Sequence, residues 1–129
     1  MTIQERAEKA AALKKSGACN CCQAVTGVFA DTVGVGETTL KNLSAGFAGG
    51  MGCMQATCGA FIGANIIAGL RSEGNGSAKK ARELLTKFKE KSGATICGEL
   101  KGVGTGKVLC ECDDCVRNAV LSLGEVLGN

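Results

Sequence analysis

The feature that most restricts how this chain can fold is a long uncharged run. The 29 residues between Lys41 and Arg71 include no Asp, Glu, Lys or Arg. Such a run belongs either in a protein core or in a membrane. It also contains seven glycines, four of them clustered between Gly46 and Gly52, which leaves only residues 53–70 for a continuous helix. We therefore expect a buried helix and no membrane insertion.

Small residues define one face of this expected helix. Alanines recur at every fourth position from Ala56 to Ala68, beside Gly59 and Gly63. Residues four apart lie on the same side of a helix, and small side chains allow a second backbone to approach closely. The pattern predicts that residues 53–70 form the centre of a helical bundle.

Apolar residues recur at helical spacing in the rest of the chain, and no segment has the alternating pattern of a strand. Thr2 followed by Glu5 matches a capping box, and Ser77 and Asp113 or Asp114 are expected to begin later helices. Besides residues 53–70, helices are expected over residues 2–17, 19–33, 37–47, 77–91 and from 113 or 114 onward, with a short helix or turn at 94–100 and a loop at 102–106. The prediction is an all-α fold: residues 1–129 form a single-domain helical bundle of about six or seven helices around a central glycine/alanine-rich helix.

Composition excludes much familiar site chemistry. The chain contains nine cysteines but no histidine. Without histidine there can be no Ser-His-Asp triad, no Cys-His pair and no histidine-ligated zinc or haem. Any unusual chemistry must therefore come from cysteine.

The charge pattern argues against a nucleic-acid partner. The formal net charge is only +3, and the lysine-rich stretch from Arg71 to Lys91 is interrupted by glutamates, as expected for a solvated helix face. Glu5 and Arg6 lie where a signal peptide would need an apolar core, which favours a cytoplasmic location. In a reducing compartment, nine cysteines are better suited to metal or redox chemistry than to structural disulfides.

The cysteines are grouped along the chain. The groups are Cys19, Cys21 and Cys22; Cys53 and Cys58; Cys97; and Cys110, Cys112 and Cys115. Several close thiols in a histidine-free chain are typical of soft-metal ligation, above all by iron–sulfur clusters. A single cysteine such as Cys53 can equally be a small buried apolar residue.

Three segments resemble a known family. They are Asn20-Cys21-Cys22-Gln23-Ala24-Val25, Ser44-Ala45-Gly46-Phe47-Ala48-Gly49-Gly50-Met51-Gly52, and Cys58-Gly59-Ala60-Phe61-Ile62-Gly63. In content and order they are similar to the C_GCAxxG_C_C family, whose members are described as redox-active. The resemblance implies four characteristic cysteines, which match Cys22, Cys58, Cys97 and Cys115. Cys19, Cys21, Cys53, Cys110 and Cys112 are additional here, which makes more than one cubane cluster conceivable.

The sequence thus predicts a redox protein that binds one or more iron–sulfur clusters. Cys22, Cys58, Cys97 and Cys115 are the preferred ligands, and the other five cysteines are secondary candidates. Two alternatives stay open: a metal-free thiol–disulfide redox protein, and a protein that stores or senses copper(I) or zinc. The sequence leaves open whether the protein carries electrons to a redox partner or catalyses a reduction itself. A homodimer is also expected, because so much apolar and glycine-rich sequence can require cover beyond one chain's own core.

Overall fold

The computed structural model describes residues 1–128 and confirms the all-α prediction. Over these residues it contains seven α-helices, a short 3-10 segment and an irregular turn, and no strand. In chain order the elements are α1 (Ile3–Lys15), α2 (Cys21–Gly27), η1 (Ala30–Thr32), α3 (Glu37–Ser44), η2 (Gly50–Met54), α4 (Gly59–Arg71), α5 (Ser77–Ser92), α6 (Cys97–Lys101) and α7 (Cys112–Leu127).

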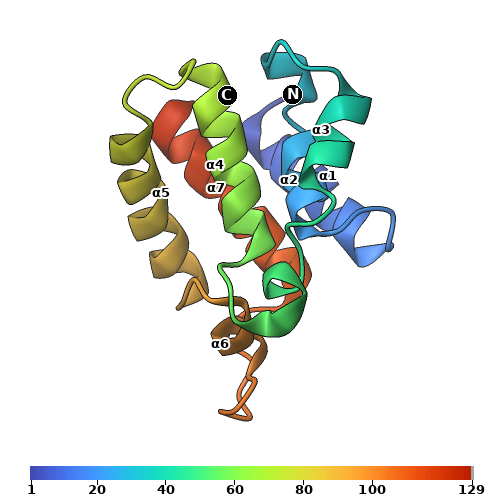
Figure 1. Cartoon of the computed structure of the whole chain (residues 1–129), viewed down its shortest axis with the longest axis vertical. Coiled ribbons are helices and arrows are strands. Elements are labelled where there is room, and N and C mark those ends of the chain that lie inside the picture. Colours follow the sequence, from blue (N-terminus) through green and yellow to red (C-terminus); the bar gives the residue numbers. More distant parts are fainter. Residues whose placement is uncertain (129) are drawn as a thin grey trace.

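Helices α4 and α7 lie at the centre of the molecule (Figure 1). Helix α1 packs on α7, α2 packs on α4, and α5 covers the opposite side of both central helices. The fully buried side chains come from most of these helices; the largest are Phe29, Phe88, Leu40, Ile67, Leu84, Leu100 and Leu123. The glycine/alanine-rich segment is therefore central, as predicted.

The close approach to α4 occurs at its glycines. A Cβ atom added to Gly63 would lie 3.0 Å from the backbone oxygen of Cys22 and 3.0 Å from the Cβ of Val25 in α2. At Gly59 the added atom would lie only 2.1 Å from the carbonyl oxygen of Phe47. Both positions therefore need a residue without a side chain.

The start of α4 differs from the sequence prediction. The helix begins at Gly59 rather than near residue 53, because residues 50–54 form η2, in which Met51 and Met54 have φ angles of 62° and 63°. Thr57 then makes an isolated antiparallel bridge with Ile96. Neither a left-handed turn nor a pairing with a distant residue continues a right-handed helix. Ala56 consequently lies outside the small-residue face.

Other boundaries differ by smaller amounts. The helix expected over residues 19–33 is shorter and ends at Gly27, and the one expected over 37–47 ends at Ser44. Helix α5 is capped by Gly76 instead of Ser77, and α7 by Glu111 instead of Asp113 or Asp114. The Thr2–Glu5 capping box is present as predicted. None of the helices in residues 1–128 combines the length and apolar character needed to span a bilayer.

Candidate functional site

Four cysteines from four different helix starts line one cavity. Cys21, Cys97 and Cys112 are the first residues of α2, α6 and α7, and Cys58 is the N-cap residue of α4. The cavity has a volume of about 140 Å³. It lies where the lower ends of α4 and α7 meet α6 and η2 in Figure 1. Residues far apart in the sequence thus converge on one small space.

The Thr57–Ile96 bridge places Cys58 beside Cys97. The backbone N–H of Cys58 donates to the Thr95 carbonyl at 2.7 Å, and the N–H of Cys97 donates to the Ala56 carbonyl at 2.9 Å. Each of these cysteines is therefore held by its own backbone at the point where its helix begins. Paired backbone groups define position more rigidly than side-chain contacts alone.

Asn20 fixes the start of α2 and with it Cys21. The Asn20 side chain accepts a hydrogen bond from the N–H of Gln23 at 2.8 Å, and the Gln23 side chain accepts one from the Asn20 N–H. Asn20 also donates to the Ala45 carbonyl at 2.9 Å. This capping box satisfies N–H groups at the first turn and ties α2 to the segment after α3.

The turn η2 closes one side of the cavity. Gly50 has a φ of 59°, and a Cβ at this position would lie 2.9 Å from the Cβ of Cys97. The Cys97 thiol donates to the Met54 thioether sulfur at 3.7 Å. Ala48 and Gly49 complete this wall. The glycine-rich segment thus brings backbone close to the thiols.

Two lysines bring positive charge to the site. Lys14 at the end of α1 and Lys101 at the end of α6 both line the cavity. The Lys101 ammonium donates to the Cys110 carbonyl at 2.8 Å and to the Cys115 sulfur at 3.4 Å. Burial alone would lower the pKa of Lys101, but the nearby Cys115 and Cys112 sulfurs raise it overall, so this lysine stays charged.

Cys21 and Cys112 form one pair of interacting thiols. A hydrogen bond from Cys21 lowers the pKa of Cys112 to about 5, assisted by the charges of Lys101 and Lys14. The same hydrogen bond, together with burial, raises the pKa of Cys21. This interaction therefore favours the thiolate form of Cys112 over that of Cys21.

Cys58 and Cys115 form a second pair. A hydrogen bond from Cys115, together with the backbone N–H groups of Ala60 and Phe61, lowers the pKa of Cys58 to about 7. Hydrogen bonds to Cys110 and Cys58, and burial, raise the pKa of Cys115. The Cys58 thiolate lies at the N-terminal end of α4, where the helix dipole favours negative charge.

The four cysteines that match the family resemblance are gathered around Cys58. Cys115 is hydrogen-bonded to it, and Cys22 and Cys97 interact with it electrostatically. Cys22 is fully buried behind Cys21, and burial raises its pKa to about 11. Only Cys58 and Cys97 of this set line the cavity, where they are joined by Cys21 and Cys112 from the secondary candidates.

The remaining cysteines lie elsewhere. Cys53 is exposed on η2, and its thiol donates to the Gly50 carbonyl at 3.3 Å. Cys19 lines a different surface cavity together with Lys9 and Leu13. Cys110 lies next to Cys115 but outside the cavity described above. All nine cysteines are free thiols.

Sequence analysis missed Lys14 and Lys101 as site residues. Lys101 carries a recognisable signal, since it follows Cys97 by four residues and so lies on the same face of a helix. Lys14 carries none, because its position depends on how α1 packs. Across residues 1–128 there is no group of three or more His, Cys, Asp or Glu side chains that could hold a metal ion.

Comparison with known proteins gives one match. A family model described as "Putative redox-active protein (C_GCAxxG_C_C)" matches residues 19–126, a span that includes all nine cysteines. No curated protein and no solved structure matches the chain.

Proposed function

Because this chain belongs to the C_GCAxxG_C_C family of redox-active proteins, we propose that its cysteine cavity binds an iron–sulfur cluster and that the protein transfers electrons. The proposed ligands are the four cysteines that line the cavity: Cys21, Cys58, Cys97 and Cys112. When bound, such a cluster supplies reversible electron transfer at a potential set by its surroundings.

One observation carries this proposal: four thiols from four separate helix starts converge on a single small cavity. Four cysteines are the usual ligand set of both two-iron and four-iron clusters. A set of buried apolar cysteines would need no such convergence, since each could fill a different gap in the core. The donor chemistry of the cavity therefore fits the proposed cofactor.

The charges around the cavity also fit a thiolate-bound cluster. Thiolate ligands bring negative charge into a partly buried space, which is costly unless it is compensated. Lys14 and Lys101 supply positive charge, and the backbone N–H groups of Ala60 and Phe61 at the start of α4 interact with the Cys58 sulfur. Hydrogen bonds of this kind orient sulfur ligands and tune a cluster's potential.

The proposed site differs in kind from a site for one metal ion. In a four-iron cluster each thiolate binds an iron of its own, and in a two-iron cluster two thiolates bind each iron. The four sulfurs therefore need not meet at one point as they do around a single zinc. Cys22 and Cys115 both interact with Cys58 and are fully buried. In this proposal they surround the ligand Cys58 and do not bind the cluster themselves.

Single Cys→Ser variants test the ligand assignment. Iron and acid-labile sulfide are measured per chain in protein purified without oxygen. Cys21→Ser, Cys58→Ser, Cys97→Ser and Cys112→Ser are each expected to lose most of both, because each removes one ligand. Cys53→Ser is the matched control and is expected to retain the wild-type content, since its thiol is exposed outside the cavity.

The same series separates two ligand sets. If Cys22→Ser and Cys115→Ser lose iron while Cys21→Ser and Cys112→Ser keep it, the cavity residues are not the ligands. The ligands would then be the four cysteines implied by the family resemblance. Full iron and sulfide in Cys58→Ser and Cys97→Ser, which belong to both sets, would reject the proposed site altogether.

A further inference from the structure

Cys115, which interacts with Cys58, also lies next to Cys110, outside the proposed cluster cavity. Cys110 is in the loop before α7, and Cys115 is in the first turn of that helix. The two side chains interact, which lowers the pKa of Cys110 and raises that of Cys115. The Cys115 thiol also donates to the Cys110 carbonyl at 3.7 Å. Neither residue lines the cavity of the four proposed ligands.

The two cysteines differ in their surroundings. Cys115 is fully buried, whereas Cys110, although only 8% exposed, forms part of the wall of a surface cavity of about 330 Å³. The other lining residues come from α5, the loop and α7; they are Lys91, Val108, Leu109, Glu111, Asp114 and Asn118. This volume lies at the lower end of the range for small-molecule sites. Of the two cysteines, only Cys110 borders a space that a small molecule could enter.

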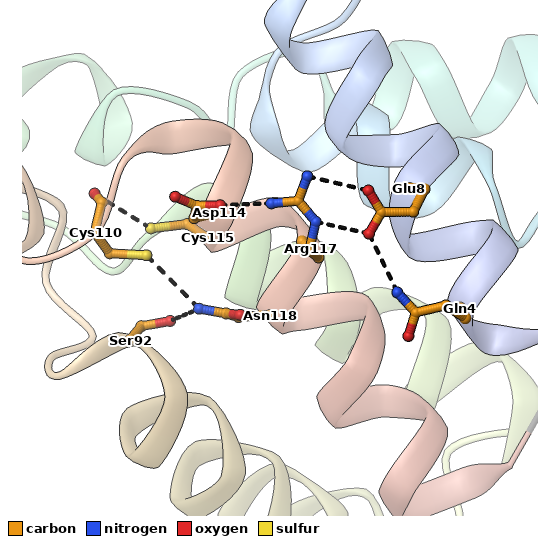
Figure 2. Close-up of polar contacts among 8 residues, drawn as sticks. All are labelled: Gln4, Glu8, Ser92, Cys110, Asp114, Cys115, Arg117 and Asn118. Carbon is orange, nitrogen blue, oxygen red and sulfur yellow. Dashed lines mark hydrogen bonds and ion pairs between the residues drawn. The ribbon is translucent and has the colours of Figure 1, made fainter.

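Neighbouring side chains hold the pair in place. The Asn118 amide donates to the Cys110 sulfur at 3.7 Å and to the Ser92 hydroxyl at 3.0 Å (Figure 2). Lys101 contacts both residues, since its ammonium donates to the Cys110 carbonyl and to the Cys115 sulfur. One cysteine borders a surface cavity and its neighbour is fully buried, an arrangement suited to thiol–disulfide exchange.

We propose that Cys110 and Cys115 form a dithiol site that reduces low-molecular-weight disulfides entering the surface cavity beside Cys110. This inference goes beyond the proposed cluster and does not depend on it. Cys110 is the attacking residue because it borders the cavity, and Cys115 is the resolving residue because it is buried next to Cys110.

The reaction is a two-electron exchange. The Cys110 thiolate attacks one sulfur of the substrate disulfide, so that a Cys110–substrate disulfide forms and the first substrate thiolate leaves and takes up a proton. The Cys115 sulfur then attacks Cys110, the intramolecular disulfide forms, and the second substrate thiolate leaves with the proton of Cys115. Two protein sulfurs are oxidised and two substrate sulfurs are reduced. A dithiol reductant restores the starting state by the reverse exchange.

Disulfide mapping of the wild-type chain tests this inference. The reduced protein, freed of reductant, is treated without oxygen with bis(2-hydroxyethyl) disulfide, and the remaining thiols are alkylated. Residues 108–117 form one tryptic peptide that contains Cys110, Cys112 and Cys115. We expect this peptide to carry one alkyl group, on Cys112, and an internal Cys110–Cys115 disulfide. Alkylated Cys110 and Cys115, or a disulfide that joins either of them to Cys112, would overturn the proposal.

Two variants separate the roles of the pair. Cys115→Ser should stop the reaction at the first step and leave the probe attached to Cys110. Cys110→Ser should leave Cys115 alkylatable and slow the consumption of the probe at least about tenfold. Cys53→Ser, which removes another accessible thiol, is the control and should still form the Cys110–Cys115 disulfide.

The outcome is distinguishable from a failure of the cluster proposal. Iron and sulfide are measured in the same samples, and Cys110→Ser should retain the wild-type content. Formation of the disulfide in a protein without iron would reject the cluster and support the dithiol site. Wild-type iron and sulfide content without a Cys110–Cys115 disulfide would support the cluster and reject the dithiol site.

Discussion

Lys101 is the residue whose charge contacts the cysteines directly. Its ammonium lies 3.4 Å from the Cys115 sulfur and lines the cavity of the proposed cluster. Reduction adds negative charge to a cluster, and a nearby cation stabilises the reduced form. Lys101→Gln is therefore expected to lower the reduction potential by tens of millivolts in a redox titration.

Lys15→Gln provides the control for this prediction. Lys15 is exposed at the end of α1, next to Lys14, so solvent screens its charge. Its replacement removes the same net charge and should shift the potential much less. An unchanged or higher potential in Lys101→Gln would contradict a role for this lysine in stabilising the reduced state.

At the residue scale, the sequence predicts that cysteine carries the chemistry, but it does not predict which cysteines line the same cavity. The absence of histidine and the grouping of cysteines indicate a thiol site. Cys21 and Cys22 are neighbours in sequence, yet only Cys21 lines the cavity. That difference depends on how α2 is rotated against α4, which is determined by packing at Gly63 and not by local spacing.

At the element scale, the glycines of α4 give a prediction about stability. Gly59→Leu and Gly63→Leu should each destabilise the fold by at least about 1–3 kcal/mol, because their side chains would overlap neighbouring backbone. Gly69→Leu is the matched control in the same helix, since a Cβ at Gly69 has no atom within 4 Å. The melting temperature of each of the three variants is measured by thermal unfolding. Equal melting temperatures for Gly59→Leu and Gly69→Leu would contradict the close packing.

The cap of α2 gives a prediction that links stability to the site. Asn20→Ala should cost about 1 kcal/mol, as is usual for loss of an N-cap, and should also reduce iron content, because Asn20 fixes the helix start that carries Cys21. Thr2→Ala removes the equivalent capping box of α1, far from Cys21 in sequence. It should lower stability by a similar amount but leave iron content unchanged. Equal iron content in both variants would contradict the positioning role of Asn20.

Helices were easier to predict from sequence than their ends. The apolar stripes of α5 and α7 are local and survive in the structure, as does the Thr2 capping box. The start of α4 could not be predicted, because it depends on a left-handed turn at Met51 and on a bridge from Thr57 to Ile96, 39 positions away. Interactions between distant segments have no periodic signature in the sequence.

At the scale of the whole molecule, oligomeric state stays a prediction. Val103, Val108 and Leu109 are each about half exposed on the loop that follows α6. Exposed apolar side chains of this kind can be covered by a second copy of the chain. We expect light scattering of the cofactor-loaded protein at micromolar concentration to give the mass of a dimer. The mass of one chain would contradict this prediction.

The whole fold explains why nine cysteines can serve more than one purpose. Four line a cavity between helix starts, two form a pair beside a surface cavity, and Cys53 is exposed. The bundle achieves this by bringing the N-terminal ends of α2, α4, α6 and α7 to one place (Figure 1). The sequence predicts the bundle, but only the assembled structure shows which cysteines line each cavity.

The most direct test of the central claim is the visible absorption of the native protein, purified without oxygen, before and after addition of dithionite, together with its iron and acid-labile sulfide content. The chain contains no tryptophan or tyrosine, so its own absorption interferes little. We predict a brown protein that contains both iron and sulfide and whose visible absorption bleaches on reduction. A folded, colourless protein that contains neither would contradict the proposed cluster.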